Sequence, residues 1–524
     1  MNIFTNALNR VLGVVGLPKL QASAHAGASL DDKAMLSWNP VKGSPDADLL
    51  PDLDTLVARS RDLARNNGVA QGAMQTHLDN IVGTGLRLSC LPDYRALGKD
   101  KDWAEEWSTR IESLWQAWAN STNIDAGNSL NFWMMTRLVL RSVLLNGEAL
   151  GLALWLPGLG RTATRMQLIE PDRLSNPVGR LDNERLRSGI EIDERGGANA
   201  YWIRKTHPGD WYGTMMRFGG DEWERVPAFT PWGRRRVIHI FDRERVGQSR
   251  GKPILSAVLP QFRMLDRYQS AELQAAIVNA MIAAFIETPM EQTAVAELFG
   301  ADPNSEQFKS WLQQRREYVA PLRGGAIIPI YPGDKLQPFT PGRPANAFDS
   351  FVTGIFRHIA VGLNLPYELL LKDFSKTNYS SARAALLEAW RFFNSSRQWL
   401  SSLWATPVYE LWLEESINAG LIEAPGFHDN REFYMRCKWI GPGRGWIDPV
   451  KEAQAAEIRM DGGISTLEDE CADQGRDWVE VLEQRARERE VMRSLGLLDA
   501  AERSSQRPVA VDQAGNQQEE RVPA

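Results

Sequence analysis

The sequence predicts an α+β fold with several parts, and three observations lead to that prediction. The chain has 524 residues, with 43% apolar and 24% charged residues, so it can bury a large core. Short apolar runs separated by proline and glycine fill residues 148–250, which is typical of strands. Amphipathic helical patterns lie on both sides of them, and no regular strand–helix alternation indicates a doubly wound sheet.

Helices dominate the first part of the chain. A helical pattern starts at Leu50, with Asp52 or Asp54 as its cap, and the glycines at 83 and 85 end it. Its candidate buried positions are Leu56, Ala64, Ala70 and Ile81. A strand is expected at 86–91, a Trp-rich amphipathic helix at 103–118, and a helix at 130–145 that ends at Asn-Gly.

The sheet-rich part follows this last helix. The expected strands lie in EALGLALWLP (148–157), RMQLIEP (165–171), SGIEID (188–193), NAYWIRK (199–205) and RRRVIHIF (234–241). Each is short and rich in β-branched, aromatic or other apolar residues, and each is bounded by turn formers.

A long helical segment, 252–289, begins or kinks at Pro260 and ends at Pro289. Residues 307–319 read as a helix, and 323–346 as two short strands around a Pro-Gly turn in a small protruding lobe. The next helix, 347–363, has one apolar stripe and is ended by Pro366. That stripe consists of Phe348, Val352, Ile355 and Ile359.

Helices also make up the remainder, with expected ranges of 382–403, 407–420, 448–460 and 477–494. Residues 1–50 read as an arm with little core of its own, and the polar tail 503–524 as disordered. The 19 tryptophans indicate either a Trp-rich core or large packing surfaces between subunits.

Charge and cysteine content restrict the function. The net charge is −6 and the pI about 5.8, so a tight DNA-gripping protein is not indicated, and the arginines at 234–236 are read as a solvated face. Three widely spaced cysteines fit a reducing compartment rather than a disulfide framework. No zinc-type spacing, signal peptide or membrane-spanning run is found, and no cofactor or metal is expected.

Motifs of common enzyme classes are missing from the sequence, which has no G-x-S-x-G, HExxH or phosphate-binding glycine loop. Ile169–Asp172 (IEPD) holds two carboxylates, but Pro171 interrupts a strand there, so a salt-bridged or solvated turn is favoured over a glycosidase-like pair. Asn146–Glu148 (NGE) reads as a helix exit, and His239 as a core or half-buried strand residue. We therefore predict no catalytic residues.

The segment KDFSKTNYSSARAALLEAWR (372–391) has two interpretations. Its hydroxyl and amide side chains favour a corner between helices, with Ser380 or Ser381 as the cap of a helix that begins near Ala382. Alternatively, the loop contacts a polyanion, with Lys372 and Lys376 supplying charge and the serines, threonine and asparagine donating to phosphate without reading bases.

The sequence resembles the lambda-type family of tailed-phage portal proteins, the head–tail connectors. The resemblance covers roughly residues 50–470. It is carried in order by RSRDLARNNGVAQGA (59–73), NIVGTGLRL (80–88), NGEAL (146–150), LIEPDRLSNP (168–177), GIEIDERGGANAYWI (189–203), HPGD (207–210), VIHIFDRERVGQSRGKPIL (237–255), LNLPYELLLKDFSKTNYSSARAALLEAWR (363–391) and KWIGPGRGWIDPVKEAQA (438–455).

This resemblance implies a ring of about twelve subunits at one capsid vertex, around a channel for double-stranded DNA. The implied parts are an N-terminal arm (1–50), a sheet-rich wing (51–251), stem helix 1 (252–289), a small α/β clip (290–345), stem helix 2 (346–366), a tunnel loop (367–381), the return to the wing (382–470), crown helices (471–502) and a tail (503–524). The implied DNA-facing residues of the tunnel loop are Lys372, Ser375, Lys376, Thr377, Asn378, Tyr379, Ser380 and Ser381.

Further expectations come from the same resemblance. The protein is expected in the virion, and in the host cytoplasm during assembly. Its implied partners are the terminase large subunit, the major capsid or scaffold protein and a head-completion protein, with no membrane. Two other classes stay open: a phage enzyme such as a nuclease or protease, and a monomeric binding protein of the virion. Light scattering would separate a ring from a monomer.

Overall fold

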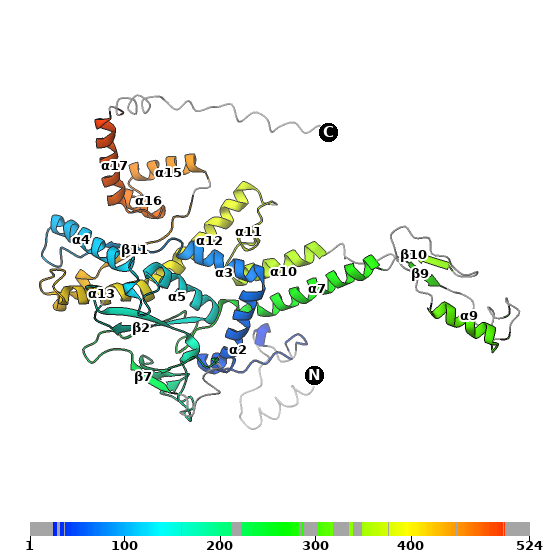
Figure 1. The fold of residues 1–524 in the computed structure, drawn as a ribbon. Helices are drawn as coiled ribbons and strands as arrows, with labels where there is room; N and C mark the ends of the chain where they lie inside the picture. Colours follow the sequence, from blue (N-terminus) through cyan, green and yellow to red (C-terminus); the bar gives the residue numbers. More distant parts are fainter. Residues whose placement is uncertain are drawn as a thin grey trace, which may run out of the picture.

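The computed structural model describes the backbone of residues 25–28, 32–35, 37–158, 160–210, 222–281, 284–287, 297, 302, 304–317, 335–338, 348–375, 377–445, 448–495 and 497. The fold is mixed α and β, as predicted (Figure 1). The main helices are α2 (Pro45–Asn66), α3 (Gly68–Ile81), α4 (Lys101–Ala119), α5 (Phe132–Asn146), α7 (Leu259–Met281), α9 (Glu306–Glu317), α10 (Phe348–Gly362), α11 (Tyr367–Leu371), α12 (Tyr379–Leu400), α13 (Thr406–Asn418), α15 (Pro449–Asp461), α16 (Leu467–Asp473) and α17 (Trp478–Ser494).

The first helical pattern is divided into two helices. Ser44, not Asp52 or Asp54, caps α2, because the Ser44 side chain accepts a hydrogen bond from the backbone N–H of Ala47. Asn67 interrupts the pattern: its extended backbone ends α2, and its side chain accepts from the second and third residues of α3. Of the predicted buried positions, Ala70 and Ile81 are fully buried, whereas Leu56 and Ala64 are only partly covered.

All strand pairs among the described residues are antiparallel. The central sheet has the order β3 (Thr164–Ile169), β2 (Glu148–Trp155) and β8 (Val237–Phe241). A second sheet is a meander of β4 (Leu186–Arg187), β5 (Ile190–Ile192), β6 (Ala198–Arg204) and β7 (Trp223–Pro227). The expected strands in 148–250 are confirmed, but β4 and β7 were not predicted. β1 (Arg87–Cys90) pairs with β11 (Cys437–Ile440) and so joins the two ends of the body.

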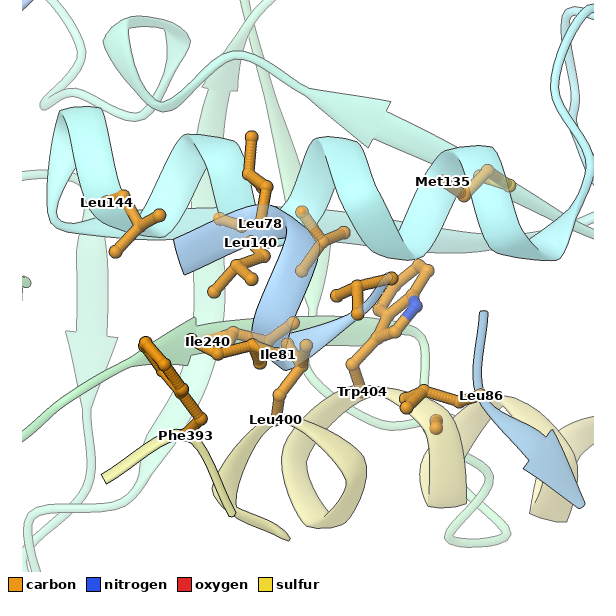
Figure 2. Close-up of a cluster of buried hydrophobic side chains, with 14 of the residues drawn as sticks. Leu78, Ile81, Leu86, Met135, Leu140, Leu144, Ile240, Phe393, Leu400 and Trp404 are labelled. Atoms are coloured by element: carbon orange, nitrogen blue, oxygen red, sulfur yellow. The ribbon is translucent and has the colours of Figure 1, made fainter. Parts of the chain in front are cut away.

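The core lies where α3, α5 and the chain after α12 cover the central sheet (Figure 2). Figure 2 shows Leu78 and Ile81 of α3 facing Leu140 of α5, with Ile240 of β8 and Leu400 beside them. The other labelled members are Leu86, Met135, Leu144, Phe393 and Trp404. Four tryptophans at 107, 115, 404 and 412 are buried, so the core interpretation holds for these, while Trp38, Trp155 and Trp232 are exposed.

Two helices, α7 and α10, lie side by side and project from the body toward a lobe that holds α9, β9 (Ala284–Glu287) and β10 (Lys335–Pro338) (Figure 1). The ring of Tyr268 stacks on Phe348, 5.6 Å between centroids, and meets Phe351 edge-on at 4.9 Å. The helix predicted within 252–289 starts beside Pro260, as one of its two alternatives allowed, but it is too long at its C-terminal end, where β9 follows α7. Pro260 lies at the start of α7, while Pro289 lies outside the described residues.

The lobe is joined by a long-range strand pair. β9 pairs with β10 along Ala284–Glu287 and Lys335–Pro338. β10 is one of the two strands predicted in 323–346, and the other predicted strand lies outside the described residues. The predicted helix 307–319 corresponds to α9.

Helix α12 continues without a break through a π-helical turn, η5 (Ser401–Ala405), into α13. The C-terminal helices α15, α16 and α17 follow, and none of them has a buried residue. α16 was not predicted separately. Among the described residues, none of the helices is both long enough and apolar enough to cross a bilayer.

Candidate DNA-contacting loop

The predicted loop lies between α10 and α12, on a support that the sequence builds from apolar anchors. Beyond the end of α10, Leu363 and Leu365 are buried and hold the chain against the body. Between them Asn364 takes a left-handed conformation, with a φ of 53°. Pro366 then starts the short helix α11, whose Leu370 is also buried. These residues fix the direction in which the loop leaves the body.

Lys372 ends α11 in a left-handed conformation, with a φ of 56° and a ψ of 33°. Its backbone N–H donates to the carbonyl of Glu368, and the N–H of Asp373 donates to the same oxygen at 3.2 Å. The position after a helix that adopts this conformation is usually glycine, because a Cβ there is sterically unfavourable. The lysine side chain is exposed, and within the described part of the chain it forms no ion pair.

Hydrogen bonds within the loop shape its backbone. The N–H of Ser375 donates to Asp373 Oδ1 at 2.9 Å, and the N–H of Thr377 donates to the carbonyl of Phe374 at 3.2 Å. Thr377 is half-buried, and its hydroxyl donates to Glu368 Oε1 at 3.2 Å. Thr377 thus has a structural partner, and its hydroxyl is less available to a ligand than those of exposed residues.

The cap of the following helix differs from the prediction. Asn378 Oδ1 accepts from the N–H of Ser381 at 2.8 Å, so Asn378 caps a helix that begins at Tyr379. The prediction that Ser380 or Ser381 is the cap is wrong: both are exposed residues of the first helical turn. Lys376 lies outside the described residues. Ser375 and Asn378 are exposed beside Lys372, so three of the predicted side chains share one loop surface.

Hydrogen bonds attach the C-terminal part of α12 to the end of α3. Arg397 donates through Nε to the carbonyl of Ile81 at 3.0 Å and through Nη2 to that of Asn80 at 2.8 Å. Burial lowers the pKa of Arg397 to about 10, so it remains charged at neutral pH. Burial also lowers the pKa of His77, on α3, to about 4, and its ring meets Phe393 edge-on at 6.0 Å. These contacts attach the C-terminal part of α12 to α3, and the loop lies at the opposite end of α12.

Carboxylates at two places in the body have structural partners. Arg61 of α2 binds Glu170 and Asp172 of the IEPD turn, each at 2.6 Å, and His207 Nε2 lies 2.9 Å from Asp172. The salt-bridged interpretation of this turn is confirmed. Arg61 and His207 lower the pKa of Asp172 against the opposing effect of burial, which favours a charged, ion-paired carboxylate at this turn.

Glu148 lies at the second place, and its partners were not predicted. It opens β2, is fully buried, and pairs with Arg250 and with His239 Nε2, the latter at 2.9 Å. Burial alone would raise the pKa of Glu148, but the Arg250 guanidinium and the His239 hydrogen bond bring it down to about 2. His239 lies in β8 with a buried side chain, as predicted.

No group of three or more histidine, cysteine or carboxylate side chains in the described ranges could hold a metal ion. A local signal for the Glu148–Arg250 pair was not available, because 102 residues separate the partners.

Comparison with known proteins agrees with the motifs. The chain is 35% identical to portal protein B of Escherichia phage lambda over 510 residues, which is 94% of each protein. It is 36% identical to the portal protein of Escherichia phage N15, over 91% of each, and 26% identical to a probable portal protein of Halomonas phage phiHAP-1, over 88% of this chain and 85% of that one.

Solved structures show a weaker likeness. The neck of an empty gene transfer agent particle matches with a TM-score of 0.47 and 13% identity, over 84% of this chain and 97% of that one. A family model described as phage portal protein, lambda family, matches residues 31–397. With that match and relatives that share a third of their residues along nearly the whole length, the chain belongs to the lambda family of phage portal proteins.

Proposed function

We propose that this portal protein assembles as a ring of twelve copies at one vertex of the capsid, and that double-stranded DNA passes through the ring during packaging and ejection. In this proposal α7 and α10 form the stem, the lobe that holds β9, α9 and β10 is the clip, and the sheet-rich body is the wing. The segment 367–381, which consists of α11, the loop and the start of α12, faces the channel, and residues 471–502 belong to the crown. Each subunit then contacts its neighbours through two different faces.

The conformation of Lys372 is the observation that carries the channel role. A non-glycine residue with a φ of 56° costs roughly 1 kcal/mol relative to glycine. The side chain gains no ion pair within the described residues in return. The sequence thus has a lysine at an exposed position whose backbone conformation favours glycine. There its charge can make weak and salt-sensitive contacts with phosphate.

Weak contact suits a channel. A chain with a net charge of −6 repels DNA in general, so a duplex can slide through without being trapped. The proposed docking partners are a terminase large subunit, a head-completion protein and the capsid or scaffold protein. The virion is the proposed location, with assembly in the host cytoplasm.

Substitution of Lys372 tests the channel role. Lys372→Gly removes the charge and also relieves the backbone, so we expect unfolding stability to stay equal or rise while the DNA retained in filled particles falls. Lys372→Arg should retain DNA because it keeps the charge. Asn364→Gly is the matched control, since Asn364 has the same backbone conformation without a charge. Normal DNA retention by Lys372→Gly would contradict the role of the lysine.

Mass and imaging test the ring independently of the loop. We expect light scattering to give the mass of a large ring, and class averages viewed down the axis to show a central hole wide enough for a duplex. Monomers at every concentration, with scaffold and capsid protein present, would contradict the assembly. None of the contacts described above favours the phage-enzyme alternative.

A further inference from the structure

The connection between β7 and β8 presents a tryptophan on a rigid turn. The N–H of Thr230 donates to the carbonyl of Arg234 at 2.8 Å, and the N–H of Arg234 donates back to Thr230 Oγ1 at 2.9 Å. Gly233 closes the turn with a φ of +86°. At the tip, Trp232 is 74% exposed. A large aromatic ring held this way loses little conformational freedom on binding.

Two stacked pairs flank this turn. The guanidinium of Arg234 lies 5.5 Å from the ring centre of Trp155, and that of Arg235 lies 5.1 Å from Phe229. Trp155 and Phe229 are 61% and 46% exposed. We call these five residues the arginine–aromatic patch. Exposed tryptophan and arginine are the residue types that dominate binding energy at protein interfaces.

No direct ion pair neutralises the two arginines of the patch among the described residues. Neither arginine forms an ion pair within the described residues, although Arg234 Nη2 donates to Thr164 Oγ1 at 2.6 Å. The carboxyl of Glu410 is the acid that Arg235 influences, but burial is the larger effect and raises the pKa of Glu410. A binding partner could therefore supply the missing carboxylates.

We propose that the arginine–aromatic patch docks an acidic, apolar segment of a different protein. Carboxylates of that segment would pair with Arg234 and Arg235, and an apolar pocket would receive Trp232. Phosphate of nucleic acid is the weaker match, because Trp232, Trp155 and Phe229 make the exposed area of the patch largely apolar, and a phosphate backbone offers no apolar surface to cover them.

A second copy of the chain is also a weaker match, by an argument that rests on the proposed function. If the loop between α11 and α12 faces the channel, the region of β7 lies toward the opposite side of the body (Figure 1). The connection that follows β7 then faces outward from the ring, toward whatever protein surrounds it.

Peptide binding to the full-length protein tests the proposal. The probe is a fluorescein-labelled peptide of alternating glutamate and leucine, read by fluorescence anisotropy, with a glutamine–leucine peptide and single- and double-stranded oligonucleotides as comparisons. We expect the acidic peptide to bind, and Trp232→Ala/Arg235→Glu to weaken it by about tenfold or more. Trp38→Ala/Arg195→Glu makes the same chemical change at exposed residues outside the patch and should bind as the unaltered chain does.

Three results would overturn the docking proposal. The first is equal binding of the acidic peptide by both double variants. The second is oligonucleotide binding that is lost with the patch, which would make it a nucleic-acid surface. The third is a fall in ring mass in the patch variant alone, which would make the partner a second copy. Peptide binding by a chain that forms no rings would instead contradict the proposed assembly and leave the patch in place.

Discussion

Glu112 of α4 is a carboxyl group whose charge depends on pH near neutrality. Its Oε1 accepts the backbone N–H of Cys90 at 2.6 Å, and it lines a cleft of about 580 Å³ together with Asp477, the cap of α17. Burial raises the pKa of Glu112 to about 7, and the like charge of Asp477 acts in the same direction. Near pH 7 the side chain is therefore close to half protonated.

Glu112→Gln should change how stability depends on pH. The pKa of Glu112 in the folded chain is raised above the ordinary 4.5, so the native state binds more protons than the unfolded state. The contribution of Glu112 to stability is therefore fully present below pH 4.5 and is lost as the pH rises through 7. Glutamine cannot ionise, so the variant should be more stable than the unaltered chain at pH 8.5, by on the order of 1–3 kcal/mol. Urea unfolding at pH 5 and pH 8.5 measures this difference.

The control for this prediction is Glu105→Gln, an exposed carboxyl on the same helix. The same stability difference at both pH values would contradict the assigned ionisation of Glu112.

Single residues also show what the sequence could reveal. The salt-bridged IEPD turn was predictable because Pro171 excludes a regular strand within the motif itself. The partners of Glu148 were not, since burial and the approach of Arg250 depend on how distant segments pack.

At the scale of elements, the cap of α12 controls where the loop ends. Asn378→Ala should remove the hydrogen bond to Ser381 and cost about 1 kcal/mol of unfolding stability. Hydrogen exchange of the amides at 379–382 should become faster, because the first turn would fray. Asn378→Ser keeps a capping oxygen and should behave nearly as the unaltered chain does. Equal exchange in the alanine and serine variants would show that the cap does not hold the loop.

The same element explains a limit of sequence reading. Serine and asparagine are both good helix caps, so capping propensity alone does not decide whether 378, 380 or 381 is the N-cap of α12. In the structure Asn378 has the extended backbone of a cap, with a ψ of 161°, and its side chain accepts from Ser381, a choice that propensity alone does not make. Likewise, the alanine-rich end of 252–289 favours a helix, but pairing of β9 with β10 replaces it locally by a strand.

At the scale of the molecule, the C-terminal helices differ from the body. Because α15, α16 and α17 bury no residue, little apolar contact opposes their opening in an isolated subunit. We expect their amides to exchange on the order of 100-fold faster than those of α5, in which buried residues occur from Phe132 to Asn146. Mass spectrometry of deuterium uptake in the dissociated chain measures this ratio, and uptake as slow as in α5 would contradict it.

The run from α12 through η5 to α13 has a geometric consequence. It forms one rod from Tyr379 to Asn418, roughly 60 Å long, with the loop at one end and the buried Trp404 fixed in the core along its length. In such a rod the distance of the loop from the core and its direction around the helix axis change together, because each residue adds both a rise and a rotation. One residue inserted before Leu400 would advance the loop by about 1.5 Å and also swing it by about 100°, whereas seven would restore nearly the same bearing. Relatives with longer or shorter rods should therefore differ in steps of whole turns.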